Sequence, residues 1–323
     1  MCGEKPMSYD PGFVGIDNTQ DATLSNILLD NFIQFYDWGF LDKGGFNNIS
    51  RPSSGMYGGS KHILKPVDDP NYSANQVWQA FRQNWVWETG VSKTTQPTQI
   101  SGVYRGNTFL PFSYNATSGY YVGSGYTIDY PNGRVIFNSP IPATSVVSLN
   151  YSYKWASVQR AEGVPFFRQI QNGFRLDQNF LTGSGDWVQL GQTRVQLPAV
   201  FVESPKKRTY DPYQLGGGQW ANTDIVVYVM SDKQSTCVDI LDMISYQNDR
   251  DIKLFNTNSV SKSGDIAINY NGNLVDKSNR YPDLINNHYF RNCIIYETQI
   301  NDPVWLSYSL YLGTAKFSTR VFV

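Results

Sequence analysis

Residues 102–157 read GVYRGNTFLPFSYNATSGYYVGSGYTIDYPNGRVIFNSPIPATSVVSLNYSYKWAS. The stretch is dense in aromatic and β-branched residues, is interrupted by Gly, Asn and Pro, and carries almost no charge. This pattern is typical of short strands joined by tight turns. The sequence YPNGR at 130–134 predicts a hairpin turn, because Asn and Gly tolerate the positive φ that such a turn requires. We therefore expect a β-rich module, with paired strands at 134–137 and 146–153, that packs against other surfaces.

The composition limits the classes of function. The chain has 323 residues, a formal net charge of -1 and 16% charged residues, against roughly 25% in typical soluble proteins. Such a chain is not a general nucleic-acid binder, since neutralising phosphates requires an excess of basic residues. Low charge also lowers the repulsion between copies, which suits a protein that works within an assembly.

Aromatic residues make up 15% of the chain, with 22 Tyr, 18 Phe and 8 Trp. Tyr and Trp combine a large apolar area with a polar group and are favoured at protein interfaces. The composition favours a β-rich virion or surface protein. An aromatic-rich β-sandwich core explains the same composition, and the two interpretations are compatible.

Three cysteines, Cys2, Cys237 and Cys293, are too few for a disulfide framework, and their spacing fits no metal motif. We expect folding in a reducing compartment. The first residues show no basic region followed by an apolar run, so no signal peptide is expected. No run reaches the roughly 18 apolar residues of a membrane span, which predicts no membrane association.

The N-terminal part, residues 1–95, is predicted to be an arm with two helices. Residues 1–20 are expected to be extended. The first helix is predicted from apolar residues at helical spacing, namely Leu24, Ile27, Leu28, Phe32 and Phe35. After a Gly- and Ser-rich loop, Ser73 and Gln76 have the spacing of a capping box, and a second helix is predicted to end at Gly90. One face of that helix would carry Val77, Trp78, Phe81 and Trp85.

The remaining chain divides into a β-rich module at 96–158, a connector without clear periodicity at 159–192, and an α+β domain at 193–323. Strands are predicted at 195–202, 224–230 and 251–255, with a helix carrying Cys237, Ile240, Leu241 and Ile244 on its apolar face. The predicted fold class is α+β and β-rich: an N-terminal helical arm, a small β-sandwich-like module, and a C-terminal sheet with a helix on one face.

No motif predicts catalysis, a cofactor or a metal. The two histidines, His62 and His288, have no second ligand residue at a suitable local spacing. The Gly-rich runs at 183–186 and 216–218 lack the context of a phosphate-binding loop and are interpreted as turns. The sequence has no G-x-S-x-G motif, although a Ser-His-Asp triad assembled by the fold stays open. We expect no catalytic, cofactor-binding or metal-binding residues.

Lys206, Lys207 and Arg208 form the one basic cluster that follows a predicted strand. Such a run is most often a solvated loop. The alternative is contact with an acidic partner or with nucleic acid, so the three residues are candidate contact residues.

Three blocks, at 28–39, 102–153 and 197–255, resemble structural proteins of tailed bacteriophages, especially the contractile-tailed phages of cyanobacteria and marine bacteria. Within them, LLDNFIQFYDWG opens the predicted first helix and IDYPNGRVIF surrounds the predicted turn. The order strand, helix, strand after residue 197 is similar in outline to tail-terminator folds. The resembling blocks carry turn and strand patterns and no catalytic signature.

The resemblance implies a non-enzymatic neck or tail component, a connector or tail terminator that joins the head to a contractile tail. Such a component assembles as six or twelve copies in a ring and contacts neck, portal, tube or sheath proteins. DNA would pass through the lumen. The protein would be made in the host cytoplasm and would reside in the virion.

Contact residues are expected among the exposed aromatic side chains. The candidates are Trp78, Phe81, Trp85 and Trp87 in the second helix, and Tyr120, Tyr121 and Tyr126 in the β module. Two alternatives stay open: a receptor- or carbohydrate-binding β module, with or without glycosidase activity, and a baseplate or capsid-decorating virion protein.

Overall fold

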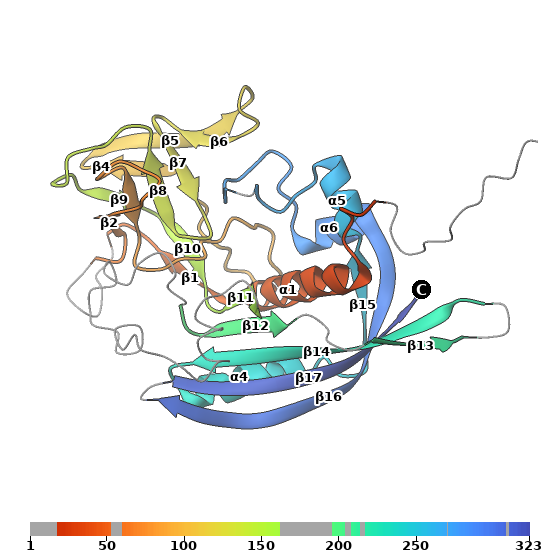
Figure 1. Cartoon of the computed structure of the whole chain (residues 1–323). Coiled ribbons are helices and arrows are strands. Elements are labelled where there is room, and N and C mark those ends of the chain that lie inside the picture. Colours follow the sequence, from red (N-terminus) through yellow and green to blue (C-terminus); the bar gives the residue numbers. More distant parts are fainter. Residues whose placement is uncertain are drawn as a thin grey trace, which may run out of the picture.

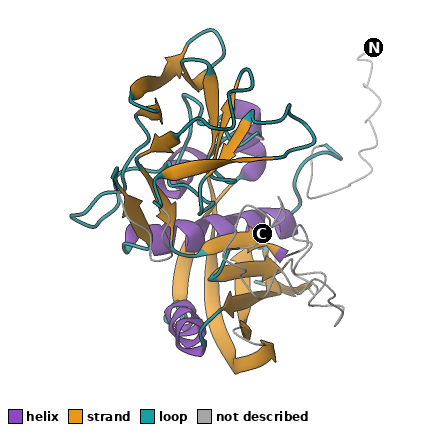
Figure 2. Cartoon of the chain, turned by 90° about the vertical axis from the view of Figure 1, so that its left-hand side faces the viewer, coloured by secondary structure: helices purple, strands orange, loops and turns teal. Residues whose placement is uncertain are grey.

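The computed structural model describes residues 18–52, 60–161, 196–203, 208–213, 217–269, 271–307 and 310–323. A β-barrel and a long curved sheet lie on opposite sides of helix α1 (Leu24–Asp42) (Figure 1). Turned by 90°, the view keeps the barrel above α1 and the sheet below it (Figure 2). The predicted class is confirmed: the fold is α+β and rich in strands.

The barrel is closed, with the strand order β2-β3-β8-β7-β6-β5-β4-β9. Its strands are β2 (Ile63–Val67), β3 (Val77–Gln79), β4 (Gly102–Arg105), β5 (Thr108–Asn115), β6 (Tyr120–Gly123), β7 (Tyr126–Asp129), β8 (Arg134–Phe137) and β9 (Val147–Leu149). The turn predicted at 130–134 joins β7 to β8, with Gly133 at φ 63°. A Cβ at Gly133 would lie 2.4 Å from the carbonyl oxygen of Arg82, so only glycine fits there.

The predicted second helix is wrong, because residues 77–79 form strand β3 of the barrel. Half of the expected capping box is present: the Ser73 N–H donates to the side-chain oxygen of Gln76 at 3.0 Å. Val77 and Trp78 nevertheless pair with β2 on one side and β8 on the other. Long-range pairing of β-branched and aromatic residues outweighs the local helix signal.

The barrel also corrects the predicted domain boundaries. Strands β2 and β3 precede residue 96, where the module was expected to begin, and the sandwich-like module closes on itself. β1 (Phe46–Ile49) pairs with β10 (Tyr151–Lys154) beside the barrel. The predicted connector at 159–192 lies almost entirely outside the described residues, as do residues 1–17 of the segment 1–20 that was expected to be extended.

The C-terminal sheet has the order β11-β12-β14-β17-β16-β15, and β13 also pairs with β14. Its strands are β11 (Ser157–Arg160), β12 (Ala199–Glu203), β13 (Arg208–Pro212), β14 (Gln219–Ser231), β15 (Arg250–Phe255), β16 (Tyr289–Ser307) and β17 (Leu310–Phe322). All neighbours are antiparallel except β11 and β12. β14 contains the central strand predicted at 224–230, and β15 contains the strand predicted at 251–255.

Two helices cover one face of this sheet. α1 inserts Leu28, Leu29 and Phe32, and α4 (Gln234–Ser245) inserts Ile240 and Leu241, into one shared core with β14 and β17. Both helices confirm predictions, although only α4 was expected on the sheet. α5 (Thr257–Ser263) and α6 (Tyr281–His288) pack beside β15. Within the described ranges, none of the helices combines the length and apolar character needed to cross a membrane.

A buried ion-pair cluster holds the barrel side of the molecule on α1. Lys154 Nζ lies 2.5 Å from the carboxylate of Asp37 on α1 and 2.6 Å from that of Glu88. The barrel also contacts the loop before α6: the Tyr121 N–H on β6 donates to the Leu274 carbonyl of that loop at 2.8 Å. These contacts fix the position of the barrel relative to the sheet.

Candidate interaction surface

Three of the seven aromatic residues predicted as contacts lie in the barrel core. Trp78, Trp85 and Tyr126 are each 1% exposed. The Trp78 indole N–H donates to the Asn75 carbonyl and the Tyr126 hydroxyl to the Leu110 carbonyl, so their polar groups are also satisfied within the barrel. For these three residues the predicted contact role is wrong: an eight-stranded barrel needs large side chains to fill its interior.

The other four predicted contacts, Phe81 and Trp87 from the predicted second helix and Tyr120 and Tyr121 from the β module, are half-buried. The Phe81 ring packs edge-on against Tyr153, with centroids 5.6 Å apart. Tyr121 packs against other barrel rings and Tyr120 pairs with Val275, while Trp87 lines a cavity of about 320 Å³ near the loop before α6. These side chains therefore join parts of one chain and leave only part of their surface to a partner.

Of the predicted basic cluster, only Arg208 belongs to the described residues. Lys206 and Lys207 lie outside the described residues. Arg208 begins β13, is half-buried, and donates a hydrogen bond from its guanidinium to the Ser25 hydroxyl on α1. Arg208 thus connects β13 to α1. The basic run 206–208 had predicted a solvated loop at this position.

Exposed apolar side chains gather instead on β16. Its last residues, Val304, Trp305 and Leu306, are 61%, 65% and 40% exposed. We call these three residues the hairpin tip, because they lie near the end of β16, where β16 pairs with the first residues of β17. Tyr296 and Ile300 on the same strand are also exposed. Contiguous exposed apolar residues are typical of surfaces that bind other molecules, so these residues of β16 are a candidate interaction surface.

The backbone of β16 is also available along one edge. β15 pairs with β16 only as far as Ile295, and β17 occupies the other side. Within the described ranges, no strand pairs with the outer edge of residues 297–301. Beyond that segment, β16 is irregular: it contains Pro303, and its register with β17 shifts between Asn301 and Val304 and again between Trp305 and Ser307. Natural sheets use such features to limit strand addition, so the regular segment before them is the part suited to pairing.

The opposite end of the sheet is β11, a strand of four residues that pairs with β12 alone in the described part of the chain. The sheet therefore ends in different strands on its two sides. One side offers the long β16 and its apolar residues, and the other offers a short strand next to α1.

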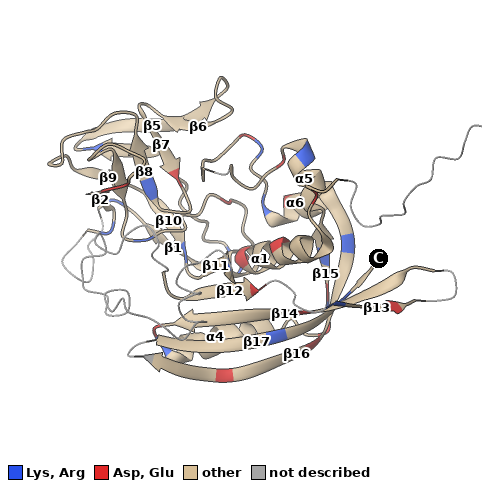
Figure 3. Cartoon of the chain, viewed as in Figure 1, with Lys and Arg blue, Asp and Glu red and all other residues tan. Residues whose placement is uncertain are grey.

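The long strands β14, β16 and β17 of the sheet carry few charged residues (Figure 3). There the Arg320 guanidinium lies 5.5 Å from the Trp220 ring centroid and 5.3 Å from that of Tyr296. Lys316 pairs with Asp224 at 2.9 Å, and that ion pair raises the pKa of Lys316. Lys316 and Asp224 thus match each other within the chain, and the Arg320 guanidinium also donates to the Asn222 side chain.

The hairpin tip could have been found from the sequence. Three consecutive apolar residues in a strand place side chains on both faces, so at least one is exposed unless both faces are covered. In β17 the burial alternates as expected for a strand with one covered face, since every second residue from Gly313 to Val321 is buried. No such inference was drawn for residues 304–306.

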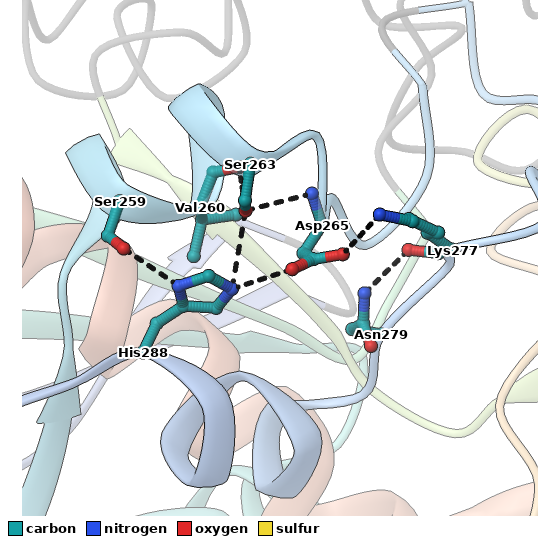
Figure 4. A network of polar contacts seen from close by, with 7 residues as sticks. All are labelled: Ser259, Val260, Ser263, Asp265, Lys277, Asn279 and His288. Carbon is teal, nitrogen blue, oxygen red and sulfur yellow. Dashed lines mark hydrogen bonds and ion pairs between the residues drawn. The ribbon is translucent and has the colours of Figure 1, made fainter.

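Figure 4 shows a polar network centred on His288, the residue with which α6 ends. Its Nδ1 lies 2.9 Å from the Ser259 hydroxyl, and its Nε2 lies 3.0 Å from the carboxylate of Asp265. The Ser263 hydroxyl lies 3.4 Å from Nε2. The hydrogen bond from His288 lowers the pKa of Asp265.

This network contains the three residue types of a Ser-His-Asp triad, which the sequence left open. Its geometry favours a structural role. Ser259 lies in the first turn of α5, where its N–H donates to the Asn256 side chain that caps the helix. The His288 ring is 8% exposed and connects α5 to α6. In the part of the chain that is described, no group of His, Cys, Asp and Glu residues could hold a metal ion.

No family model matches the chain, and the search of curated proteins found no similar sequence.

Proposed function

We propose that the protein is a non-enzymatic structural component of a contractile-tailed bacteriophage virion, a ring-forming connector or tail terminator of the neck. The resemblance of three sequence blocks to phage structural proteins motivates this proposal. The observation that carries it is the run of exposed apolar residues on β16 beside an unpaired strand edge. Contiguous exposed apolar residues of this kind are typical of protein–protein interaction sites.

The two ends of the sheet support assembly through different surfaces. When one surface of a copy meets another surface of the next, the contacts repeat head to tail and close into a ring if the rotation fits. The C-terminal domain would build this ring from six or twelve copies. The barrel, which has no open strand edge, would face the neighbouring layer of the neck.

The apolar residues of β16 can supply the required affinity. Covering a Trp, Leu or Val side chain contributes roughly 1.5–3 kcal/mol. Trp305, Leu306 and Val304 are each between 40% and 65% exposed, so a substantial part of this contribution is available to a partner. The near-neutral net charge of -1 leaves little repulsion between copies.

Cryo-electron microscopy of the purified particle that contains this chain tests the proposal. We expect six or twelve copies in a ring between head and tail, with the C-terminal sheets in contact around the ring. Location in fibres or spikes, or absence of the chain from purified particles, would contradict a neck function.

A second candidate is binding of a carbohydrate or receptor by the barrel. Tyr114 on β5 is 40% exposed and packs against Tyr121 on β6, with ring centroids 5.6 Å apart. Paired Tyr rings of this kind offer a surface on which a sugar can stack. A glycan array probed with the wild type and with Tyr114→Ala tests it: binding that Tyr114→Ala abolishes would favour this function, and no binding would exclude it.

A further inference from the structure

An open groove of about 900 Å³ lies between α1, the end of α4, β15 and α6. Its volume lies in the range of pockets that hold a ligand or a few side chains. The walls are aromatic and apolar, with main contributions from Phe35, Trp38, Phe40, Trp155, Met243 and Tyr281. We call this space the aromatic groove.

The rim of the aromatic groove is more basic than acidic. Lys43, Arg250 and Lys253 line it, against Asp42 and Asp251. Both acidic side chains have partners: Asp42 accepts from the Ser92 N–H and hydroxyl, and Asp251 accepts from Asn292. Lys43 pairs with Asp42 at 3.6 Å and Arg250 donates to Gln247, so Lys253 is the rim cation that an incoming negative charge would meet. The groove thus suits an apolar group that carries a negative charge beside it.

The hairpin tip has this chemistry. Val304, Trp305 and Leu306 are exposed and consecutive, and Asp302 precedes them with Pro303 between. In the same copy the tip cannot reach the groove. It lies ten residues along β16 from Ile295, where the pairing with β15 ends, and ten strand residues span about 33 Å.

We propose that the hairpin tip of one copy inserts into the aromatic groove of a second copy. The inference rests on the proposed function as an assembling protein and names the contact that joins the copies. Because tip and groove are different surfaces of the chain, the contact is head to tail and propagates from copy to copy. Asp302 would then face the basic rim of the groove.

Gly39 offers a way to close the groove without disturbing the fold. It lies on α1, lines the groove, and a Cβ at its position would meet no heavy atom within 4 Å. Gly39→Leu would fill part of the groove, and leucine favours a helix more than glycine does. Gly39→Ala is the matched control, because it changes the helix in the same direction and adds only one methyl group.

The test measures oligomeric state by native mass spectrometry and analytical ultracentrifugation for the full chain. We expect the wild type and Gly39→Ala to form oligomers. Gly39→Leu and the double variant Val304→Ser/Trp305→Ser should each stay monomeric, with a dissociation constant raised at least tenfold. Circular dichroism and thermal unfolding confirm that each variant is folded.

Mixing the two defective variants gives the sharpest result. Gly39→Leu keeps an intact tip and the serine variant keeps an intact groove, so the mixture should form one-to-one dimers that grow no further. Formation of these dimers supports the inference. Monomers only in the mixture, oligomers of Gly39→Leu like those of the wild type, or a monomeric wild type would overturn it.

The charge contact has its own test. Asp302→Lys should weaken association, and Lys253→Glu in the same chain should restore part of it. Failure of both Gly39→Leu and Asp302→Lys to change the oligomer would refute the tip-to-groove contact and leave the neck function intact. Absence of the chain from virions would instead remove the neck function, whatever the oligomer does in solution.

Discussion

The barrel and the C-terminal sheet use aromatic and apolar residues in opposite ways. In the barrel, Trp78, Trp85, Tyr126 and Tyr130 are almost fully buried. Among the described residues, seven of the seventeen large apolar side chains that are exposed lie on β16, whereas four lie in the barrel and its loops. Composition alone pointed to the barrel as the contact surface, and burial points to the sheet.

The cause of the difference is closure. A closed barrel pairs every strand on both sides and leaves no edge, so its aromatic residues fill the interior. The sheet is open, and in the described residues part of β16 lacks a second neighbour. The barrel is therefore complete within one chain, and the sheet is the part to which our proposal assigns the contact with a partner.

Two tryptophan substitutions test this contrast, and they should give the largest difference in the free energy of unfolding. Trp78→Ala should lower the free energy of unfolding by about 3–5 kcal/mol, because it empties a fully buried site. Trp305→Ala should change it by less than about 0.5 kcal/mol, because the side chain is 65% exposed. Urea unfolding of monomeric protein measures both. Equal losses would show that the tip belongs to the folded core of one chain.

Breaking the buried ion pairs of Lys154 with Asp37 on α1 and with Glu88 tests whether the contact between the barrel side and α1 stabilises the whole fold. Burial raises the pKa of Glu88, and Lys154 opposes that effect. Lys154→Met leaves the carboxylates of Asp37 and Glu88 buried without their cation, so we expect a loss of about 3–5 kcal/mol in urea unfolding.

Two controls accompany Lys154→Met. Lys316→Met removes an ion pair on the sheet that is exposed to solvent, and no measurable loss is expected. Replacing Glu88 and Asp37 by leucine together with Lys154→Met should recover much of the stability. A large loss in the Lys316 variant would contradict the assignment of the sheet surface to partner contacts.

The network around His288 predicts a pH effect confined to the helices beside the sheet. The lowered pKa of Asp265 means that its contribution to stability is present above the unfolded carboxyl pKa of about 3.9. The contribution is lost as the pH falls through the lower pKa of the folded state. Asp265→Asn should therefore lower the melting temperature at neutral pH, and the difference from wild type should vanish at strongly acidic pH. A difference that persists there would exclude this ionic origin.

The smallest effect is expected at Tyr36, where α1 meets the sheet. Its hydroxyl is buried and has no hydrogen-bond partner in the described part of the chain. Tyr36→Phe keeps the ring contacts with Phe317 and removes the unsatisfied group, so the free energy of unfolding should stay equal or rise by about 1 kcal/mol. Thermal unfolding checks this, and a marked loss would reveal a partner for the hydroxyl.

Local sequence patterns correctly predicted the elements whose apolar residues follow a single helical or strand periodicity, or whose turn has a characteristic sequence. The spacing of Leu28 and Phe32 gave α1, the apolar run 224–230 gave the central strand β14, and YPNGR gave the β7–β8 turn. The helix prediction for residues 73–90 was wrong because the capping signal at Ser73 is local. The strand pairing of Trp78 depends instead on β2 and β8, which are distant in sequence. Only these neighbours decide the outcome.

The candidate surface was harder to predict than the fold. Whether an aromatic residue is buried depends on barrel closure, which brings strands from residues 63–79 and 102–149 together. The aromatic groove combines residues of α1, α4, β15 and α6, which are far apart in the sequence. The hairpin tip is the exception, because its three consecutive apolar residues are visible in the sequence alone.

The most direct test of the contrast compares two multiple variants by native mass spectrometry. One replaces the exposed barrel residues Phe109 and Tyr114 by serine, and the other replaces Val304 and Trp305 by serine. We predict that the barrel variant forms the same oligomers as the wild type and that the tip variant is monomeric. Loss of the oligomer in the barrel variant, with retention in the tip variant, would contradict the assignment of assembly to the sheet.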